Sequence, residues 1–370
     1  MVDLNAQRDT AQGSFRYESS NLRFSSPLFA TLAGACAEDD DICGLGSAVR
    51  PGQPIALLIL LATQYLLFRA PESKLADYFP SMTDTPKPAD EAFPVFREFC
   101  LDRREALQHL LSTRTVNTNL VERASIILPA SQYVASLTKE PLTLVEMCCS
   151  AGLNLLFDEY HYDYGVAGKV GRENAPVMLS CKVTGKSRPP IDAIPPVRYR
   201  VGIDLVKVDC SNPDGRMWMD AMLAPEWRIE RARLRKALSL RADRDVRIVE
   251  GDMLSALPAI LEELPGAPMI LHTFCNGQWF AAAQGRLDEI LRHASRHRDI
   301  HRIGVEIPDA EPPQEIRARL AAIAAAGISI RQKNLPGRIE HTRYSRGATG
   351  ETELLGHADG MGSWIDWRAS

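Results

Sequence analysis

The stretch PLTLVEMCCSAGLNLLFDEY, residues 141–160, decides the fold of this chain. An apolar run leads into Glu146, and small residues with a single glycine, Gly152, follow it. After Gly152 the apolar residues recur at helical spacing. The stretch therefore predicts a buried strand, a tight turn and an amphipathic helix, which is the order of elements at the cofactor-binding turn of a doubly wound α/β sheet.

The rest of the C-terminal half repeats this alternation of strand and helix. Short apolar runs that end at a polar or small residue, each followed by helical periodicity, occur at 199–205, 245–252, 268–275 and 300–308. A further helix is expected at 312–327, and the run at 328–335 together with the C-terminal residues is expected to supply the last, antiparallel strands. Such repetition predicts an α/β fold with a Rossmann-like sheet.

The N-terminal part of the chain follows a different pattern. It shows helical periodicity and no two-residue alternation typical of a strand. We therefore expect an all-helical region over residues 1–140 and an α/β domain over residues 141–370. Within that domain a long connection predicts an insertion at about 161–200, either a lid beside the ligand edge or a surface decoration.

The composition is that of an ordinary globular protein of 370 residues, with 45% hydrophobic residues and a net charge of −4. This charge favours neither nucleic acid nor an anionic membrane as a partner. The most apolar stretch, residues 54–70, is too short to span a bilayer and predicts a buried helix. The N-terminal residues lack a signal-peptide core, and the eight cysteines show no zinc-ligand spacing, so we expect a cytoplasmic protein with reduced thiols and no metal site.

Three acids, Glu146, Asp204 and Asp252, stand at the ends of predicted strands. The carboxyl ends of parallel strands share one edge of a sheet, where the ligands of open α/β folds bind. We therefore expect the three carboxylates to meet at a ligand site. The alternative for Asp204 and Asp252 is a structural role, as helix N-caps or turn residues after their strands.

These acids favour S-adenosylmethionine over a dinucleotide as the ligand. A pyrophosphate needs a glycine-rich turn and no nearby anion, whereas this turn has one glycine and Glu146 would repel a phosphate. S-adenosylmethionine instead carries an ammonium and a sulfonium. We expect Glu146 to bind the ammonium directly or through water and Asp204 to bind the ribose hydroxyls. Asp252 would bind the adenine amino group, with Met253 or Leu254 against the ring.

The motifs VEMCCSAGLN, VGIDL, VEGDML and MILHTF resemble successive strand-end motifs of class I S-adenosylmethionine-dependent methyltransferases. More closely, the chain resembles the bacterial domain-of-unknown-function family 2332, through stretches such as SPLFATLA, TRTVNTNLVERASIILPA and SAGLNLLFDEYHYDYG. The resemblance implies a methyltransferase-type sheet behind an N-terminal helical region. Carried over by position, it implies a cofactor site formed by Glu146, Cys148, Ser150, Gly152, Asn154, Asp204, Asp252, Met253 and His272.

Two other interpretations of the same turn stay open. CCSAG, residues 148–152, is one residue from the nucleophile elbow GxSxG, which makes Ser150 the nucleophile of a serine hydrolase with Asp252 and His357 as partners. The long helical region before the turn argues against this hydrolase. The third interpretation is a protein of methyltransferase fold that binds a nucleoside, or serves as a scaffold, without chemistry.

The leading prediction is S-adenosylmethionine-dependent methyl transfer to a small molecule, with the helical region and the insertion on the acceptor side. His272 is a candidate base, and the catalytic residues stay unassigned. The basic segment 228–247 is expected to form an amphipathic helix with a solvated basic face. Polar residues expected to reach over the cofactor edge or to bind an anionic acceptor are Arg114, Asn117, Asn119 and Arg123.

Overall fold

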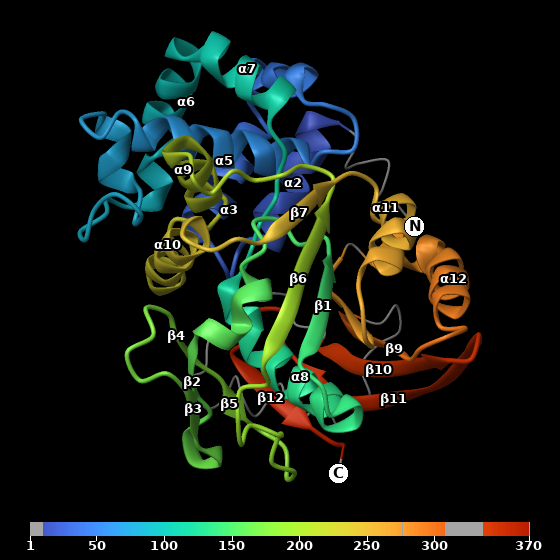
Figure 1. Ribbon diagram of the computed structural model, residues 1–370. Coiled ribbons are helices and arrows are strands. Elements are labelled where there is room, and N and C mark those ends of the chain that lie inside the picture. The colour runs from blue at the N-terminus through green and yellow to red at the C-terminus, as the bar shows by residue number, and fades with distance from the viewer. Residues whose placement is uncertain (1–9, 276, 308–335, 370) are drawn as a thin grey trace. The chain divides into compact units, whose positions relative to one another are not determined.

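The structure is a computed structural model, which describes residues 10–275, 277–307 and 336–369. The chain divides into two compact units (Figure 1). Unit 1 contains residues 10–118 and 212–232, and unit 2 contains the other described residues. This division differs from the expected boundary at residue 140, because residues 119–140 belong to unit 2 and unit 1 includes a segment of the C-terminal half.

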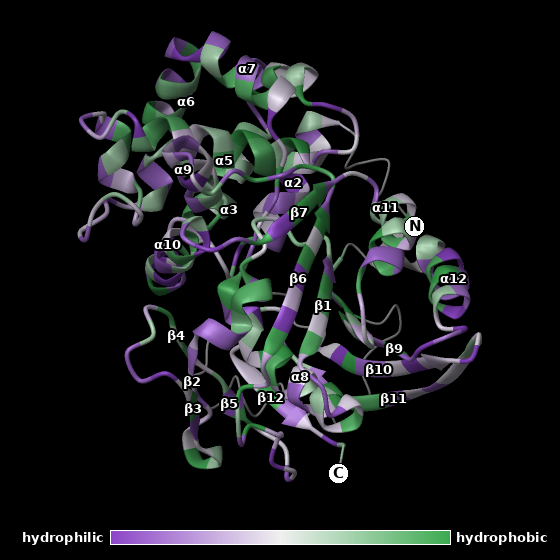
Figure 2. Cartoon of the chain, in the orientation of Figure 1, coloured by the Kyte–Doolittle hydropathy of each residue, from purple (hydrophilic) through white to green (hydrophobic). Residues whose placement is uncertain are grey.

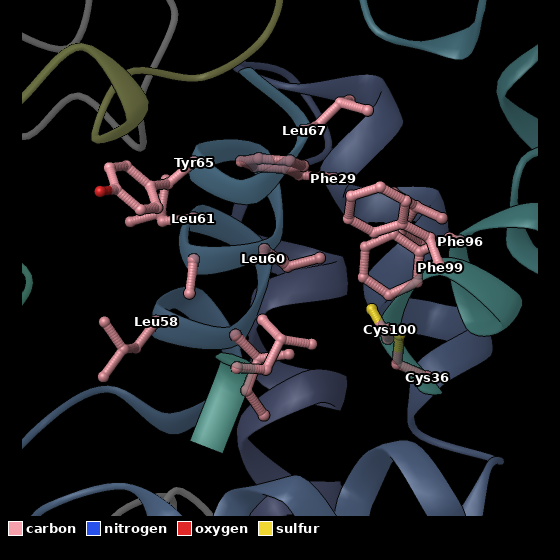
Figure 3. Packing of buried hydrophobic residues seen from close by; sticks show 14 of the residues in the cluster. Phe29, Cys36, Leu58, Leu60, Leu61, Tyr65, Leu67, Phe96, Phe99 and Cys100 are labelled. Carbon is pink, nitrogen blue, oxygen red and sulfur yellow. The ribbon is translucent and has the colours of Figure 1, made fainter. Parts of the chain in front are cut away.

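Unit 1 is helical and packs around α5 (Ile55–Phe68). Figure 2 shows α5 as largely hydrophobic, and Figure 3 shows its side chains beside the aromatic rings of neighbouring helices. Gln64, which interrupts this apolar run, donates from its Nε2 to the carbonyl oxygens of Ala221 and Leu223 at 2.9 and 2.8 Å. The amide is therefore hydrogen-bonded within the core, and the predicted buried helix is confirmed.

The other helices of unit 1 are α2 (Ala11–Asn21), α3 (Pro27–Cys36), α4 (Asp40–Gly44), α6 (Phe93–Asp102), α7 (Arg104–Thr113) and α9 (Pro213–Ala221). Short 3-10 segments join them at Leu45–Ala48, Lys74–Tyr78 and Ala89–Glu91. Within the described ranges, none of the helices combines the length and the apolar character that a membrane span requires.

Unit 2 is built on a mixed, mostly parallel sheet of nine strands, in the order β5-β12-β11-β10-β9-β8-β1-β6-β7. Its parallel strands are β1 (Leu142–Met147), β6 (Val197–Asp204), β7 (Arg247–Glu250), β8 (Pro268–Thr273) and β9 (Ile300–Glu306). The antiparallel strands β10 (Gly337–Ser345), β11 (Ala348–Ala358) and β12 (Trp364–Trp367) follow, and β5 (Lys182–Val183) pairs with β12. The predicted α/β class is confirmed, and the predicted helices are present after β6, β7 and β8.

Helices cover both faces of this sheet. On one face α11 (Met253–Glu263) and α12 (Gly277–Ala294) pack against alternate residues of the parallel strands, among them Val145 and Met147 of β1. Because side chains alternate along a strand, Glu146 points to the other face. There β1 contacts η5, a 3-10 segment at Asn154–Glu159, which in turn contacts α8 (Ala124–Thr138). The remaining helix, α10 (Arg228–Ala242), contains the boundary between the units.

The amphipathic helix predicted after Gly152 is wrong. The chain forms η5 instead, with a non-helical residue at Leu156. Its first four residues, from Asn154 to Phe157, are all buried, so the apolar side chains fill the core in succession rather than one stripe of a helix. The helix predicted at 312–327 and the strand predicted at 328–335 lie outside the described residues.

The predicted insertion forms a small sheet of three strands, β2 (His161–Asp163), β3 (Lys169–Gly171) and β4 (Met178–Ser180), with a 3-10 turn at Gly165–Ala167. It then supplies β5 to the edge of the main sheet. The buried Tyr160, Tyr162 and Tyr164 donate their hydroxyl protons to backbone carbonyl oxygens. The insertion is therefore tied into unit 2 by both a strand and a buried aromatic row.

Candidate functional site

The parallel strands of unit 2 place a topological switch point between β1 and β8. From β1 the chain continues to β6 and β7 on one side, and β8 and β9 then add on the other side. At such a point the connections leave the sheet in opposite directions and open a crevice outside the carboxyl ends. Figure 1 shows the arrowheads of β1 and β6 at the same edge of the sheet. The turn that was predicted to bind a cofactor lies at this edge.

The turn of residues 148–152 has an unusual backbone. Cys148, Ser150 and Gly152 have φ angles of 55°, 52° and 72°, so left-handed residues alternate along it. Residues other than glycine rarely adopt positive φ angles, so the surrounding structure must hold Cys148 and Ser150 in this conformation. Gly152 is also closely packed, because an added Cβ would lie 3.0 Å from the Cδ1 of Ile248. Gly152 is therefore required by the turn itself.

Side chains from neighbouring elements hold this turn. The carboxylate of Asp204, at the end of β6, accepts from the Ser150 backbone N–H at 2.7 Å through Oδ2 and from the Val206 N–H at 3.2 Å through Oδ1. Asn119 donates from Nδ2 to the carbonyl oxygen of Cys149 at 2.8 Å. Burial raises the pKa of Asp204, although the backbone N–H groups oppose this shift. Asp204 thus has the structural role that was considered as an alternative for it, that of a turn residue after its strand.

Glu146 is the buried acid of the site. Its side chain is 1% exposed, and its Oε1 accepts from the Nδ2 of Asn154 at 2.9 Å. Two acceptor atoms of this pair, Oε2 of Glu146 and Oδ1 of Asn154, are buried without a hydrogen-bond partner among the described residues. Burial raises the pKa of Glu146 to about 8, the contacts with Asn154 and Arg123 lower it, and Asp204 raises it further. Since buried polar groups are normally satisfied, these two oxygens call for a hydrogen-bond partner from outside the chain.

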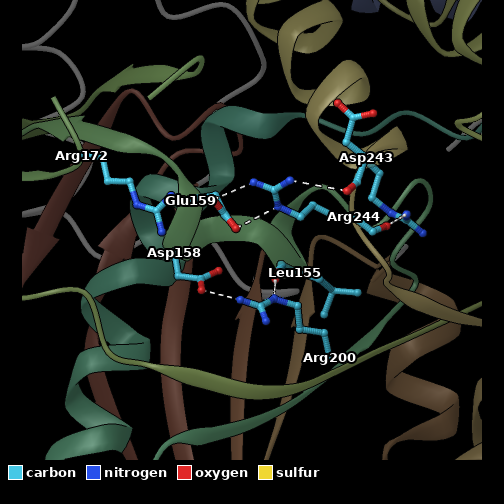
Figure 4. Close-up of polar contacts among 8 residues, drawn as sticks. Leu155, Asp158, Glu159, Arg172, Arg200, Asp243 and Arg244 are labelled. Carbon is cyan, nitrogen blue, oxygen red and sulfur yellow. Dashed lines mark hydrogen bonds and ion pairs between the residues drawn. The ribbon is translucent and has the colours of Figure 1, made fainter. Parts of the chain in front are cut away.

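Arginines fix the segment that carries Asn154, as Figure 4 shows. Arg200 of β6 donates from Nε to the carbonyl oxygen of Leu155 at 3.0 Å and forms an ion pair with Asp158. Arg244 pairs with Glu159 at 3.0 Å between Nε and Oε1. Both ends of η5 are thereby anchored to neighbouring elements of unit 2.

Asp252 and Met253 have local structural roles. Asp252 is the N-cap of α11, and its Oδ1 accepts from the backbone N–H and the hydroxyl of Ser255 at 2.9 and 2.7 Å. Met253 is 7% exposed and packs in the apolar core beneath α11, as does Leu254. The N-cap alternative for Asp252 is confirmed. A contact between Met253 and an adenine ring finds no support in this packing.

His272 lies on the opposite face of the sheet from Glu146. The register of β1 and β8 pairs Met147 with His272 and Glu146 with Leu271. Side chains of paired residues in parallel strands point to the same face, so His272 shares the face of Met147. Glu146 is paired with Gly202 of β6, and Asp204 lies two residues further along β6, so Glu146 and Asp204 share one face of the sheet. His272 lies on the other face.

His272 instead forms a dyad with Glu306 of β9. Its Nδ1 lies 2.8 Å from Oε1 of Glu306, and the same oxygen accepts from the backbone N–H of Cys275 at 3.2 Å. Burial lowers the pKa of His272, and the contact with Glu306 raises it. Gly304 makes room for the imidazole, since an added Cβ there would lie 2.7 Å from Cε1 of His272. Glu306 was missed in the sequence, although it too is an acid that ends an apolar run.

The polar segment at 112–123 divides between the two units. Arg114 forms an ion pair with Asp214 at 2.5 Å within unit 1. Asn119 holds the turn, as described above, and Arg123 donates from Nε to the carbonyl oxygen of Gly360 at 3.0 Å. The positive charge of Arg123 lowers the pKa of Glu146. Asn119 and Arg123 are therefore the two residues of this segment that reach the edge of the sheet.

The basic helix at 228–247 was predicted to expose its arginines, and this is wrong for two of them. Arg231 and Arg241 are buried. Arg231 donates to the carbonyl oxygen of Asp220 at 2.6 Å, whereas Arg241 donates to those of Ala151 and Val246 at 3.2 and 2.9 Å. Arg241 is thus a further support of the turn. A guanidinium with five donors can satisfy several carbonyl oxygens inside a fold, which helical periodicity does not reveal.

The catalytic triad of a serine hydrolase is not assembled. Ser150 is 3% exposed and follows β1, whereas His357 is on β11. Three strands, β8, β9 and β10, lie between β1 and β11. At the usual spacing of strands this separation is roughly 19 Å. Asp252 is engaged as the cap of α11, so the three residues do not meet.

Comparison with known sequences shows the family of this chain. The profile of the bacterial family described as "Uncharacterized protein conserved in bacteria (DUF2332)" matches residues 14–367. The chain belongs to this family. No curated protein and no solved structure matches it. The resemblance to family 2332 is confirmed, and the resemblance to methyltransferases stays a prediction.

In this DUF2332 member the edge of the sheet holds two polar groups, and the charge of Arg123 acts on the acids of both, Glu146 and Glu306. One is the turn with Glu146, Asn154 and Asp204, which is rich in carboxyl and amide oxygens. The other is the dyad of His272 and Glu306 on the opposite face. The first group is suited to a ligand that donates hydrogen bonds and carries positive charge, because oxygens of carboxylates and amides accept such bonds.

Proposed function

We propose that the protein binds S-adenosylmethionine at the turn after β1 and uses it to methylate a small molecule. The observation that carries the proposal is the buried pair of oxygens without a hydrogen-bond partner, Oε2 of Glu146 and Oδ1 of Asn154, which are both acceptors once Glu146 is ionised. An ammonium offers three N–H donors and a positive charge, which matches this pair. When bound, S-adenosylmethionine supplies an activated methyl group to a nucleophilic acceptor.

The other residues of the turn support the same ligand. A carboxylate has about four acceptor sites, and Asp204 uses three of them on the backbone N–H groups of Ser150, Val206 and Leu205, so it retains capacity for one hydroxyl of a ribose. Leu205 and Val206, which follow Asp204, are 71% and 36% exposed and offer an apolar surface beside it for a base. Neither His272 nor Asp252 is needed for this arrangement.

The first experiment is calorimetric titration of the full chain with S-adenosylhomocysteine and with methylthioadenosine, which lacks the amino acid part. We expect Glu146→Gln to weaken the first ligand about 10- to 100-fold, the loss that follows from removing a hydrogen bond to a charged group. Methylthioadenosine should bind both proteins equally. Glu250→Gln, at the exposed end of β7, is the matched control and should bind as the wild type does.

A second readout follows from the raised pKa of Glu146. Near pH 7 this carboxyl is largely protonated, because its pKa is about 8, and it must ionise to pair with an ammonium. Binding of S-adenosylhomocysteine should therefore release protons, seen as a binding enthalpy that depends on the ionisation enthalpy of the buffer. Absence of binding to well-folded wild-type protein would refute the proposal. Binding without methyl transfer to any acceptor would favour a non-catalytic nucleoside-binding protein.

A further inference from the structure

Two thiols lie together where β1 and β8 end. Cys148 directly follows β1 and is exposed, whereas Cys275 follows β8 by two residues and is buried. The strands are neighbours, with Met147 paired to His272. The thiol of Cys275 lies 3.7 Å from the carbonyl oxygen of Met147, the residue before Cys148, and the Cys148 side chain is the first cause of its raised pKa. Cysteines from two different strands therefore meet at the switch point.

The adjacent cysteine is turned away from this contact. Cys149 is fully buried and packs against Gly202 of β6, where an added Cβ would lie 2.4 Å from the Cys149 sulfur. Since β6 and β8 flank β1 on opposite sides, the side chains of Cys148 and Cys149 lead toward different strands. A disulfide between these two neighbours would require the turn to rearrange, whereas one between Cys148 and Cys275 joins residues at the adjacent ends of β1 and β8.

We propose that Cys148 and Cys275 form a reversible disulfide that fastens the carboxyl end of β1 to that of β8. The oxidant is a hydroperoxide such as hydrogen peroxide. The Cys148 thiolate attacks the peroxide, its S–O bond forms as the O–O bond breaks, and the released hydroxide takes up a proton to become water. The Cys275 sulfur then attacks the Cys148 sulfur, the S–S bond forms as the S–O bond breaks, and the second hydroxide leaves as water with the Cys275 proton.

Exposure assigns the two roles. Cys148 is open to a solvent-borne oxidant, and Cys275 is 4% exposed and shielded from it. The Cys148 side chain and burial raise the pKa of Cys275, so this thiol is protonated and Cys148 is the sulfur that attacks the peroxide. One peroxide is reduced to two waters while two thiols are oxidised.

The crosslink stands independently of the proposed function, but one consequence rests on it. The disulfide would fix the first residue of the turn to the opposite side of the switch point. Because the proposed ligand binds at this turn, the oxidised protein should bind S-adenosylhomocysteine at least tenfold more weakly than the reduced protein. Reduction by dithiothreitol should restore the affinity.

The test is peptide mapping of the full chain after reduction, desalting and titration with hydrogen peroxide, followed by alkylation and digestion without reductant. We expect a linked pair of peptides that contain Cys148 and Cys275 and that separate on reduction. The link should be absent from Cys148→Ala and Cys275→Ala and present in Cys149→Ala, the matched control.

Two results would overturn the proposal. One is a link between Cys148 and Cys149, and the other is conversion of Cys148 to its sulfinic acid with Cys275 still alkylated. Both are read on the wild-type protein, so the test does not depend on the folding of any variant. A crosslink that forms without changing the affinity for S-adenosylhomocysteine would refute only the consequence for binding. Failure of the reduced protein to bind that ligand would count against the proposed function alone.

Discussion

The carboxylate of Asp204 accepts a hydrogen bond from the backbone N–H of Ser150 at 2.7 Å, so the end of β6 holds the turn that follows β1. From the sequence, Asp204 was predicted to bind the hydroxyls of a ribose. In the structure it first stabilises a turn whose backbone is left-handed at every second residue. A change at Asp204 therefore alters the fold of the site as well as its chemistry.

Asp204→Ala should lower the free energy of unfolding by about 1–3 kcal/mol, because the N–H groups of Ser150 and Val206 lose their acceptor. Asp204→Asn keeps one acceptor oxygen and should lose less. Urea denaturation followed by circular dichroism measures both. Asp252→Ala, which removes only a helix N-cap, is the control and should cost about 1 kcal/mol. Equal stability of Asp204→Ala and the wild type would contradict the role assigned to this carboxylate.

The buried Glu146 should make stability depend on pH. The pKa of this group is 4.5 before folding and about 8 in the fold, so between these values the folded state holds the additional proton. The free energy of unfolding should therefore fall as pH rises through this window, by up to about 1.4 kcal/mol per pH unit, and level off above pH 8.

The measurement is the difference in urea stability between the wild type and Glu146→Gln at several pH values, since other titrating groups cancel in that difference. Glu250→Gln is exposed at the end of β7 and should keep the slope of the wild type. A difference that does not vary with pH would show that Glu146 is ionised in the folded protein at neutral pH.

Gly304→Ala should disrupt the dyad of His272 and Glu306. The new Cβ would lie 2.7 Å from the Cε1 of His272, so the imidazole must move away from Glu306. We expect a loss of about 1–3 kcal/mol in the free energy of unfolding, as for other overpacked cores. Gly285→Ala, in an exposed position of α12 with open space around it, should instead stabilise by about 0.5–1 kcal/mol. Histidine NMR signals would report the displaced ring, and an unshifted His272 signal would argue against this packing.

Ser150 should not react as an activated serine. His357 is separated from it by three strands, and the Ser150 side chain is buried in a turn. A fluorophosphonate probe should therefore leave the folded protein unlabelled, with a known serine hydrolase as the positive control. Labelling that disappears in Ser150→Ala would revive the hydrolase interpretation.

The parallel strands could be predicted from the sequence because each is a short apolar run that ends at a polar residue and precedes a helical pattern. The same rule correctly placed Glu146 and Asp204 at one edge of the sheet. It applies equally to Glu306, which was overlooked. Pattern alone does not show which face a strand-end residue occupies, because that depends on the register between strands. For this reason His272 was grouped with Glu146 although the pairing of β1 with β8 separates them.

Other features depend on the path of the backbone. An acid after a strand can bind a ribose or hold a turn, and only the direction of the Ser150 N–H shows that Asp204 holds the turn. Likewise, apolar residues at helical spacing at 153–159 predicted a helix, whereas consecutive burial of these side chains favours a 3-10 segment. The sequence also did not predict that residues 212–232 belong to unit 1. An amphipathic pattern shows that a helix has an apolar face, but it does not show which part of the protein that face packs against.

The discontinuous make-up of unit 1 has a consequence for synthesis. Its hydrophobic core includes Trp218 and Met222. In the chain these two residues come after β1 and β6 of unit 2. At the usual rate of translation, residues 10–118 wait roughly ten seconds on the ribosome before this part of their core emerges. A nascent chain at that stage exposes apolar surface that the finished protein buries, so we expect it to be a chaperone client. Because unit 1 is made of separate segments, a continuous fragment of the chain that contains all of unit 1 also contains part of unit 2.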